Sequence, residues 1–139
     1  MLKELRVDDA APWKQRYRLP ITYAAQIAVL MPTRGLAVSN KSGIYQLYAW
    51  HVSTGDLTQL TNREEGVVRG SLSPDGANVY YLQDRKGDEF GHIVRVPCDG
   101  GSPEDITPDL PLYTKWSFSF SRTGNRLGFT AATNDGFDI

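Results

Sequence analysis

The chain has 139 residues, a length typical of one domain, and 40% of them are hydrophobic and 22% charged. Fifteen basic residues stand against sixteen acidic ones, so the formal charge of -1 gives no net field to attract nucleic acid or an anionic membrane. A single cysteine, Cys98, excludes an intramolecular disulfide and fits a reducing compartment. We therefore expect an ordinary globular protein without a polyanionic partner.

The N-terminal part of the chain gives three further expectations. Residues 1–9 are charged throughout and lack the apolar segment of a secretory signal, so we expect a cytoplasmic protein. Residues 21–31 are the most apolar stretch, but they are about half as long as a membrane span. Residues 1–20 are expected to form an extended arm, pinned on a neighbouring surface by Trp13 and Tyr17. Their mixture of cations and aromatics also suits stacking on nucleic-acid bases.

Three similar hairpins follow the arm. Ser73-Pro74-Asp75-Gly76 lies between strand-forming residues and predicts a turn, because proline presets φ, aspartate bonds its own backbone and glycine accepts positive φ. Pro32-Thr33-Arg34-Gly35 and Ser121-Arg122-Thr123-Gly124 precede similar strands. The predicted turn glycines are Gly35, Gly76 and Gly124. The other two turns replace the serine or the aspartate of the middle one, so these side chains are expected to serve the turn rather than a reaction.

Strand-forming segments recur in the same order after each hairpin. The expected strands are 21–30, 36–40, 44–52 and 57–61, then 66–72, 79–83, 92–97 and 104–107, and finally 116–120, 126–133 and 137–139. Their connections are short, so neighbouring strands should pair antiparallel. Strand 44–52 has no purely polar face, and we expect both of its faces to be covered.

The spacing of the repeats indicates a β-propeller. Leu60-Thr61 and Ile106-Thr107 are 46 residues apart, and the turns that begin at Ser73 and Ser121 are 48 apart. Periods of roughly 40 to 50 residues with four strands per unit are typical of propeller blades.

We therefore predict an all-β chain that forms about two and a half four-stranded antiparallel blades. The predicted divisions are an N-terminal arm over 1–20, blade 1 over 21–62, blade 2 over 63–109 and a partial blade 3 over 110–139. Closed propellers have four to eight blades, so further blades or another copy of the chain would have to complete this one.

Two longer runs carry a resemblance to known proteins. LSPDGANVYYLQD, followed by HIVRVPCDGGSPEDIT, resembles the WD40-like (TolB-type) propeller repeat. APWKQRYRLP with RGLAVSNKSGIYQLYAWHVSTGDLTQLT is similar to the N-terminal propeller of bacterial serine peptidases of the prolyl oligopeptidase family, S9. The resemblance covers residues 11–139. It implies a propeller that caps a C-terminal α/β-hydrolase domain carrying the catalytic serine, aspartate and histidine, and that admits peptides rather than folded proteins.

The chain itself offers no catalytic group for such a reaction. A nucleophile elbow holds its serine on a tight strand-to-helix turn with the sequence G-x-S-x-G. The chain contains no such pentapeptide. Ser71 and Ser42 adjoin glycines and are expected in a strand and a turn. His51 and His92 fall in strands of different blades, without a nucleophile predicted near either. Cys98 adjoins a glycine pair and is expected to be buried or inert.

Two acidic groups are candidate binding sites. Residues 84–89 place carboxylates and a glycine in one loop, but lack the spacing that wraps calcium, so a solvated turn is expected. Glu64-Glu65 is similar to the paired glutamates with which some dipeptidyl members of the family hold a substrate's amino terminus. Adjacent glutamates are also common in exposed linkers, and that role is not assigned to them. No catalytic, cofactor-binding or metal-binding residue is therefore predicted.

Three hypotheses about function follow. The first is a non-catalytic propeller segment that gates substrate in an S9-like serine peptidase, whose hydrolase domain lies beyond this chain. Its partners would be that domain or further blades, and a peptide substrate. The second is a stand-alone WD40-like or TolB-like scaffold that binds a protein or peptide and is completed as a homo-oligomer. The third is a truncated product without a role. None of them involves a cofactor, nucleic acid or a membrane.

Overall fold

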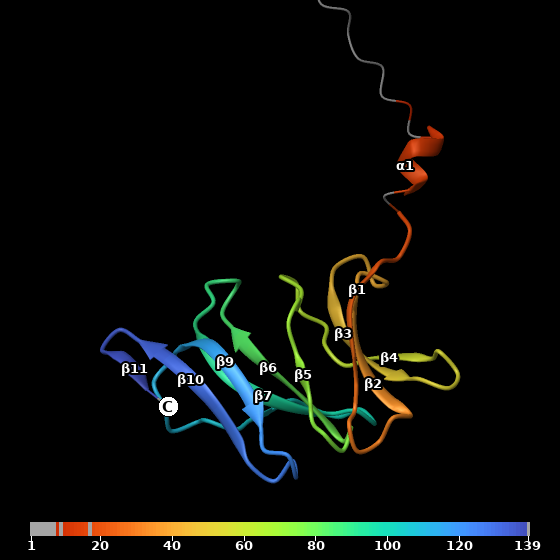
Figure 1. Ribbon diagram of the computed structural model, residues 1–139. Helices are drawn as coiled ribbons and strands as arrows, with labels where there is room; N and C mark the ends of the chain where they lie inside the picture. Colours follow the sequence, from red (N-terminus) through yellow and green to blue (C-terminus); the bar gives the residue numbers. More distant parts are fainter. Residues whose placement is uncertain (1–7, 9, 17, 139) are drawn as a thin grey trace, which may run out of the picture.

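The computed structural model describes residues 8, 10–16 and 18–138, and these form eleven strands and one short helix (Figure 1). Their bounds are α1 Pro12–Arg16, β1 Thr22–Ile27, β2 Arg34–Ser39, β3 Gln46–His51, β4 Leu57–Gln59, β5 Ser71–Leu72, β6 Asn78–Asp84, β7 Gly91–Pro97, β8 Glu104–Asp105, β9 Thr114–Phe120, β10 Leu127–Thr133 and β11 Gly136–Asp138.

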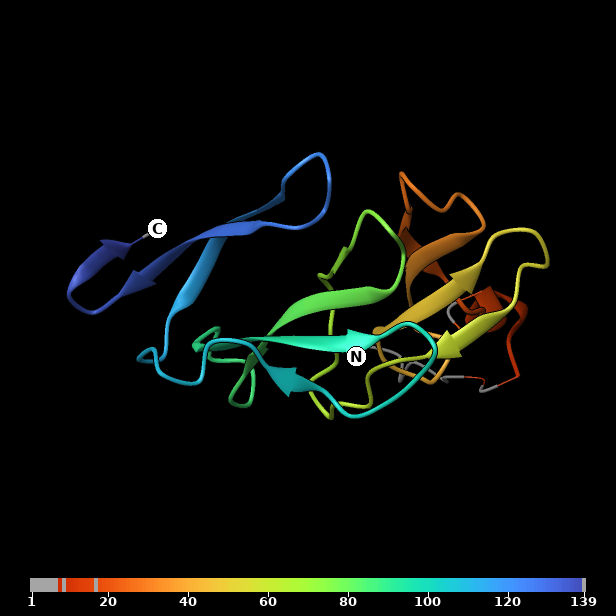
Figure 2. The same cartoon turned by 90° about the horizontal axis from the view of Figure 1, so that it is seen from below.

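The strands form three antiparallel sheets in chain order. The first contains β1-β2-β3-β4, the second β5-β6-β7-β8, and the third β9-β10-β11. Figure 2 shows the sheets side by side along the molecule. The repeats predict an all-β chain with antiparallel, four-stranded sheets, and the first two sheets confirm it. Each sheet pairs strands that are consecutive in sequence, because their connections are short.

The β5–β6 hairpin has the turn that its sequence predicts. Gly76 has a φ of 70°, and its N–H donates to the Ser73 carbonyl at 2.9 Å. The Asp75 carboxylate accepts from the Ser73 hydroxyl at 2.5 Å and from the Ala77 N–H at 3.0 Å. Gly124 has a φ of 74° and closes the β9–β10 turn in the same way. Both glycines therefore occupy the left-handed conformation that glycine adopts readily.

The prediction that Gly35 is the third turn glycine is wrong. Gly35 lies inside β2, between Ile27 and Trp50 of the adjacent strands, and the turn before it ends at Arg34. A Cβ atom on Gly35 would lie 2.7 Å from the Trp50 ring and 2.8 Å from the Gln26 carbonyl oxygen. The turn spans residues 31–34, one residue earlier than the predicted 32–35, so Gly35 is the first residue after it and is required there by close packing.

The segment before β5 is less regular than predicted. Only Ser71 and Leu72 of the expected strand 66–72 pair as a strand. The N–H of Leu72 instead donates to the Gln26 side chain at 3.1 Å, and the Gln26 amide donates to the Gly70 carbonyl at 2.8 Å. The Gln26 side chain of β1 thus forms hydrogen bonds with the backbone of residues 70 and 72, as a neighbouring strand would, and links the first sheet to the second.

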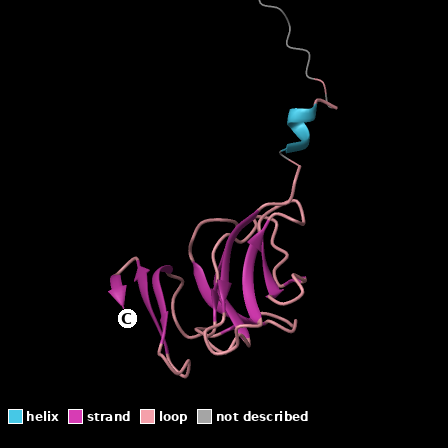
Figure 3. Ribbon diagram, turned by 45° about the vertical axis from the view of Figure 1, so that its right-hand side comes forward, coloured by secondary structure: helices cyan, strands magenta, loops and turns pink. Residues whose placement is uncertain are grey.

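The N-terminal arm also differs from the expectation of an extended segment. Residues 12–16 form α1, which lies away from the sheets in Figure 3. Trp13 is 62% exposed and lies on this helix, and Tyr17 lies outside the described residues. Within the part of the chain that the structure describes, no helix has the length and apolar character needed to cross a membrane.

Two apolar clusters hold the sheets together. The first contains Leu36 and Leu47 of the first sheet with Val79 and Val96 of the second, all at most 1% exposed. The second contains Ile93, Tyr113 and Ala131, with Tyr80, Phe118 and Phe129 packed against them. The second sheet is therefore covered on both faces. Residues 46–48 of β3 are also buried in succession, so the first half of that strand is covered on both faces as predicted, whereas Ala49 and Trp50 are half-buried and His51 is exposed.

One surface of the first sheet is left uncovered. β1 is an edge strand that is exposed at every residue. Large apolar side chains are exposed on it and next to it: Ile21, Tyr23, Ile27, Val29, Leu30 and Met31. Exposed sheet edges and contiguous apolar surfaces are typical places of association with further chain.

Candidate functional site

The three hairpin turns meet along one edge of the molecule, at the bottom of Figure 1. The Leu30 N–H donates to the Pro74 carbonyl at 2.8 Å, and a Cβ atom on Gly124 would lie 3.3 Å from the Pro74 ring. Arg34 donates to the Gly76 carbonyl at 3.3 Å and pairs with Asp99 at 3.1 Å. These contacts join each sheet to the next through its hairpin turn.

The serine and aspartate of the middle turn serve its geometry. The hydrogen bond from Ser73 is the largest cause that holds the pKa of Asp75 below its usual 3.8, followed by the Ala77 N–H. Ser73 is buried, and its hydroxyl also accepts from the Asn78 N–H at 3.0 Å. Both side chains are therefore occupied by the turn.

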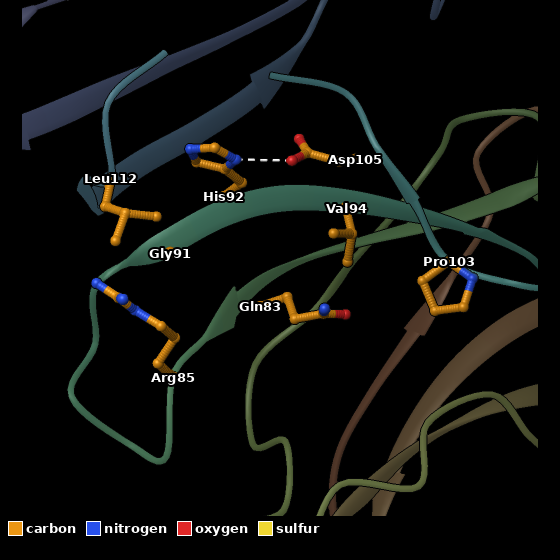
Figure 4. Close-up of a pocket in the computed structure, with 8 residues that line it drawn as sticks. All are labelled: Gln83, Arg85, Gly91, His92, Val94, Pro103, Asp105 and Leu112. Carbon is orange, nitrogen blue, oxygen red and sulfur yellow. Dashed lines mark hydrogen bonds and ion pairs between the residues drawn. The ribbon is translucent and has the colours of Figure 1, made fainter. Parts of the chain in front are cut away.

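Two cavities lie at the ends of β6, β7 and β9 that are farthest from the hairpin turns. The smaller, of about 250 Å³, is drawn in Figure 4. It lies where β6 ends and β7 begins, and its polar lining includes Gln83, Arg85, His92 and Asp105. Figure 4 shows His92 and Asp105 pointing toward one another from neighbouring strands.

His92 and Asp105 form a close pair. His92 Nδ1 lies 2.6 Å from Asp105 Oδ2, and the other carboxylate oxygen accepts from the Thr107 N–H at 2.8 Å. Burial raises the pKa of Asp105, but the hydrogen bonds from His92 and Thr107 outweigh it, and the net pKa lies below 3.8. The His92 ring stacks on Tyr113 at 5.8 Å between centroids. Its Nε2 is buried and has no hydrogen-bond partner among the described residues.

This pair does not make a hydrolytic site. A catalytic histidine needs a nucleophile within hydrogen-bond reach of its free nitrogen, and the residues lining this cavity include no serine, threonine or cysteine. His92 Nε2 is also closed to solvent, packed under its neighbours. No local sequence pattern indicates the pairing with Asp105, because the partners come from different strands.

The other candidate residues lie far from one another. His51 is exposed at the end of β3, with Nδ1 3.1 Å from the Thr54 hydroxyl. Ser42 accepts from the Tyr48 hydroxyl at 2.9 Å in the β2–β3 turn, and Ser71 lies in β5. Cys98 is buried, and burial raises its pKa to about 11. The structure brings none of these residues together.

The larger cavity, of about 600 Å³, lies between the second and third sheets. It is formed by residues 63–69 before β5, by the end of β6 with its loop, and by the start of β9. Glu65 lines it, but this carboxylate lies 3.6 Å from Arg63, which also lies 4.0 Å from Asp84. Glu64 is exposed and does not line the cavity, so the two adjacent glutamates do not face a common binding site.

The acidic loop 84–89 forms part of this wall. Asp88 accepts from the N–H groups of Arg85 at 3.2 Å and Phe90 at 3.0 Å, and Asp84 accepts from the Glu89 N–H at 3.2 Å. These carboxylates satisfy their own loop backbone, as in a solvated turn. The described residues contain no group of three histidine, cysteine or acidic side chains that could hold a metal.

The sequence did not indicate a functional role for three residues that line the larger cavity: Arg69, Lys115 and Trp116. Burial lowers the pKa of Lys115, and the positive charge of Arg69 lowers it further. Arg69 and Lys115 are 46 residues apart, the same spacing as the repeats. A search for cations at equivalent repeat positions would have found this pair.

The fold defines an all-β protein of antiparallel sheets, and comparison with known proteins adds one relative. The chain is 32% identical over 95 residues to the uncharacterized protein Atu1656 of Agrobacterium fabrum. These residues are 68% of this chain and 31% of that protein, so the chain spans about a third of the relative it matches. No protein-family model matches the sequence.

Proposed function

We propose that the chain is a non-catalytic segment of a β-propeller that gates access to the hydrolase domain of an S9-like serine peptidase. The observation that carries this proposal is the row of three hairpins, in which the turn of each sheet contacts the turn of the next through Pro74 and Gly76. Blades arranged around an axis present equivalent turns to one another in this way. The blade boundaries after residues 20, 62 and 109 belong to the same proposal.

The hydrogen bonds between sheets repeat with the same period, which also supports a propeller. The Val67 N–H donates to the Tyr45 carbonyl at 2.7 Å, where the chain passes from the first sheet to the second. Forty-six residues later, Tyr113 and Gly91 exchange backbone hydrogen bonds of 3.1 and 3.2 Å at the next passage. Each unit is thus linked to the next at the same point.

The uncovered apolar surface of β1 fits a segment that further blades would complete. In a closed propeller the first blade packs against the last, and Tyr23 and Val29, which are 70% and 80% exposed, would then be buried. Burying such side chains contributes roughly 1.5–3 kcal/mol each. The partners in this proposal are the further blades, the hydrolase domain and a peptide substrate, in the cytoplasm.

The experiment is to read the coding frame past residue 139. A peptidase requires further repeats and then a G-x-S-x-G sequence followed by aspartate and histidine. A stop codon without such sequence would overturn the peptidase. A fluorophosphonate probe should leave this chain unlabelled, since no serine among the described residues is hydrogen-bonded to a histidine. Reproducible labelling at one serine would contradict the proposal.

The length of the relative favours a second candidate function. Ninety-five residues are 31% of it, so it has about 300 residues. Six blades of the period found here would occupy roughly 280 residues and leave no room for a hydrolase domain. A TolB-like scaffold that binds a protein or peptide and is completed as a homo-oligomer is therefore the alternative. Size-exclusion chromatography with light scattering tests this alternative. A defined oligomer would support the scaffold, and a stable monomer would count against it.

A further inference from the structure

The larger cavity carries an inference that does not depend on a catalytic domain. We propose that it binds a small ligand in which one carboxylate adjoins an apolar group, with the carboxylate held by Arg69 and Lys115 and the apolar group against Trp116 and Val68. Its volume of about 600 Å³ lies within the range of small-molecule sites, roughly 300–1,000 Å³.

The two cations come from equivalent positions of neighbouring sheets. Arg69 precedes β5, Lys115 is the second residue of β9, and both line the cavity. Within the described parts of the chain, neither takes part in an ion pair. They are nonetheless close enough for the charge of Arg69 to lower the pKa of Lys115. Two like charges held close together destabilise one another, and an anion bound between them would relieve this repulsion.

The position of Lys115 strengthens this argument. Its Nζ lies 4.9 Å from the centroid of the Phe118 ring, and burial is the largest cause that lowers its pKa. A partly desolvated ammonium forms stronger charge-assisted hydrogen bonds to an anion than one in water does. Arg69 is exposed and can approach the same anion from the adjacent sheet.

The remaining charges limit the ligand to a monoanion. Arg63 lies against Glu65 and Asp84, and these three groups together carry about one negative charge. Glu89 is the other carboxylate on the wall. With Arg69 and Lys115 the six groups sum to about zero, so the local pair of cations holds the anion, and a dianion would leave a larger excess of negative charge than one carboxylate does.

The apolar side of the cavity selects the rest of the ligand. Trp116 is 69% exposed and Val68 is 52% exposed, and both lie beside the cations on the cavity wall. Tyr81 and Leu82 of β6 also line the cavity. An aromatic or aliphatic group packed here would remove exposed apolar surface from water at roughly 25 cal/mol per Å². The ligand class is therefore an apolar monocarboxylate.

Isothermal titration calorimetry on the whole chain tests the site. The probes are N-acetyl-L-phenylalanine, its uncharged amide, and 3-phenylpropanoate as an acid without an amino-acid backbone. We expect the acetylated acid to bind about tenfold to a hundredfold more tightly than the amide, since the hydrogen bonds to Arg69 and Lys115 are charge-assisted. Equal affinity of acid and amide, or no heat from either, would overturn the proposal. Comparable binding of 3-phenylpropanoate would support it and extend the class to simple arylalkanoic acids; weaker binding would support it and restrict the class to acylated amino acids.

Variants locate the carboxylate. Arg69→Gln and Lys115→Met should each weaken binding of the acid about tenfold and leave binding of the amide unchanged. Arg122→Gln is the control, because Arg122 is an exposed cation in the β9–β10 turn, at the other end of β9. Arg69 is exposed, so its variant should fold even if Lys115→Met does not. An Arg69→Gln variant with unchanged affinity for the acid would overturn the proposal. The outcome is separable from that of the proposed function, which the coding frame decides.

Discussion

Gln46 and His92 occupy the same position in consecutive sheets, 46 residues apart, and differ in how fully they are hydrogen-bonded. Gln46 donates to the Arg63 carbonyl at 2.6 Å and accepts from the Thr61 hydroxyl at 2.7 Å. His92 has only Asp105 on one ring nitrogen, and its other nitrogen has no partner among the described residues. The repeat therefore preserves the backbone while changing the chemistry of the side chain at this position.

The Gln46 network is expected to be a main stabilising element of the first sheet. Gln46 is 1% exposed, and Gln46→Ala would leave the Thr61 O–H and the Arg63 N–H without the side-chain oxygen to which both donate. Buried polar groups that lose partners cost about 1–3 kcal/mol each, so we expect a loss of roughly 2–4 kcal/mol in the free energy of unfolding. Urea unfolding followed by circular dichroism measures it. Thr58→Ala, at an exposed position of β4, is the control and should change stability by less than about 0.5 kcal/mol.

The order of the strands and the two glycine turns followed from the sequence because they rest on local chemistry. Pro-Asp-Gly and its variants specify turns without help from the rest of the chain. Gly35 shows the limit of this approach, since its turn ends one residue earlier than predicted and leaves it in a strand, where packing against Trp50 decides the residue. The hydrogen bonds of Gln26 to residues 70 and 72 likewise join parts of the chain that are distant in sequence, and no local pattern predicts them.

The candidate cavities did not follow from local sequence patterns for the same reason. Lys115 and Arg69 are ordinary surface cations in isolation, and their proximity arises only when consecutive sheets pack together. Asp105 meets His92 because β8 pairs with β7. The repeat period contains the information needed, once it is used to align side chains rather than only turns.

Gly76→Ala should destabilise the protein more than Gly43→Ala does. Both glycines have positive φ, 70° and 100°, so both substitutions place alanine in the left-handed region, at about 1–2 kcal/mol. A Cβ atom on Gly76 would also lie 2.8 Å from Arg34 Cβ and 3.0 Å from Ala28 Cβ, whereas Gly43 faces open space. The contact should add roughly 1–3 kcal/mol. Equal shifts in the urea midpoint would show that the hairpin turns do not pack as described.

The His92–Asp105 pair should make stability fall in acid. The folded pKa of Asp105 lies below 3.8, so the folded state keeps this carboxylate ionised to lower pH than the unfolded chain. The contribution is present above about pH 4 and is lost as the pH falls through the folded pKa. Asp105→Asn should therefore lose less stability than the native chain between about pH 5 and about pH 3. Asp109→Asn, an exposed aspartate on the next loop, is the control, and identical profiles for the native chain and Asp105→Asn would contradict the prediction.

Cys98 should resist thiol reagents until the protein unfolds. Cys98 is 7% exposed within the first apolar cluster, and burial raises its pKa to about 11, against a smaller lowering by Arg34. At pH 8 about one thiol in a thousand would then be ionised, and the thiolate is the reactive form. Ellman's reagent should react slowly with the native chain and reach one equivalent quickly in urea. Rapid reaction of the native chain at pH 8 would show that the interface between the first two sheets opens readily.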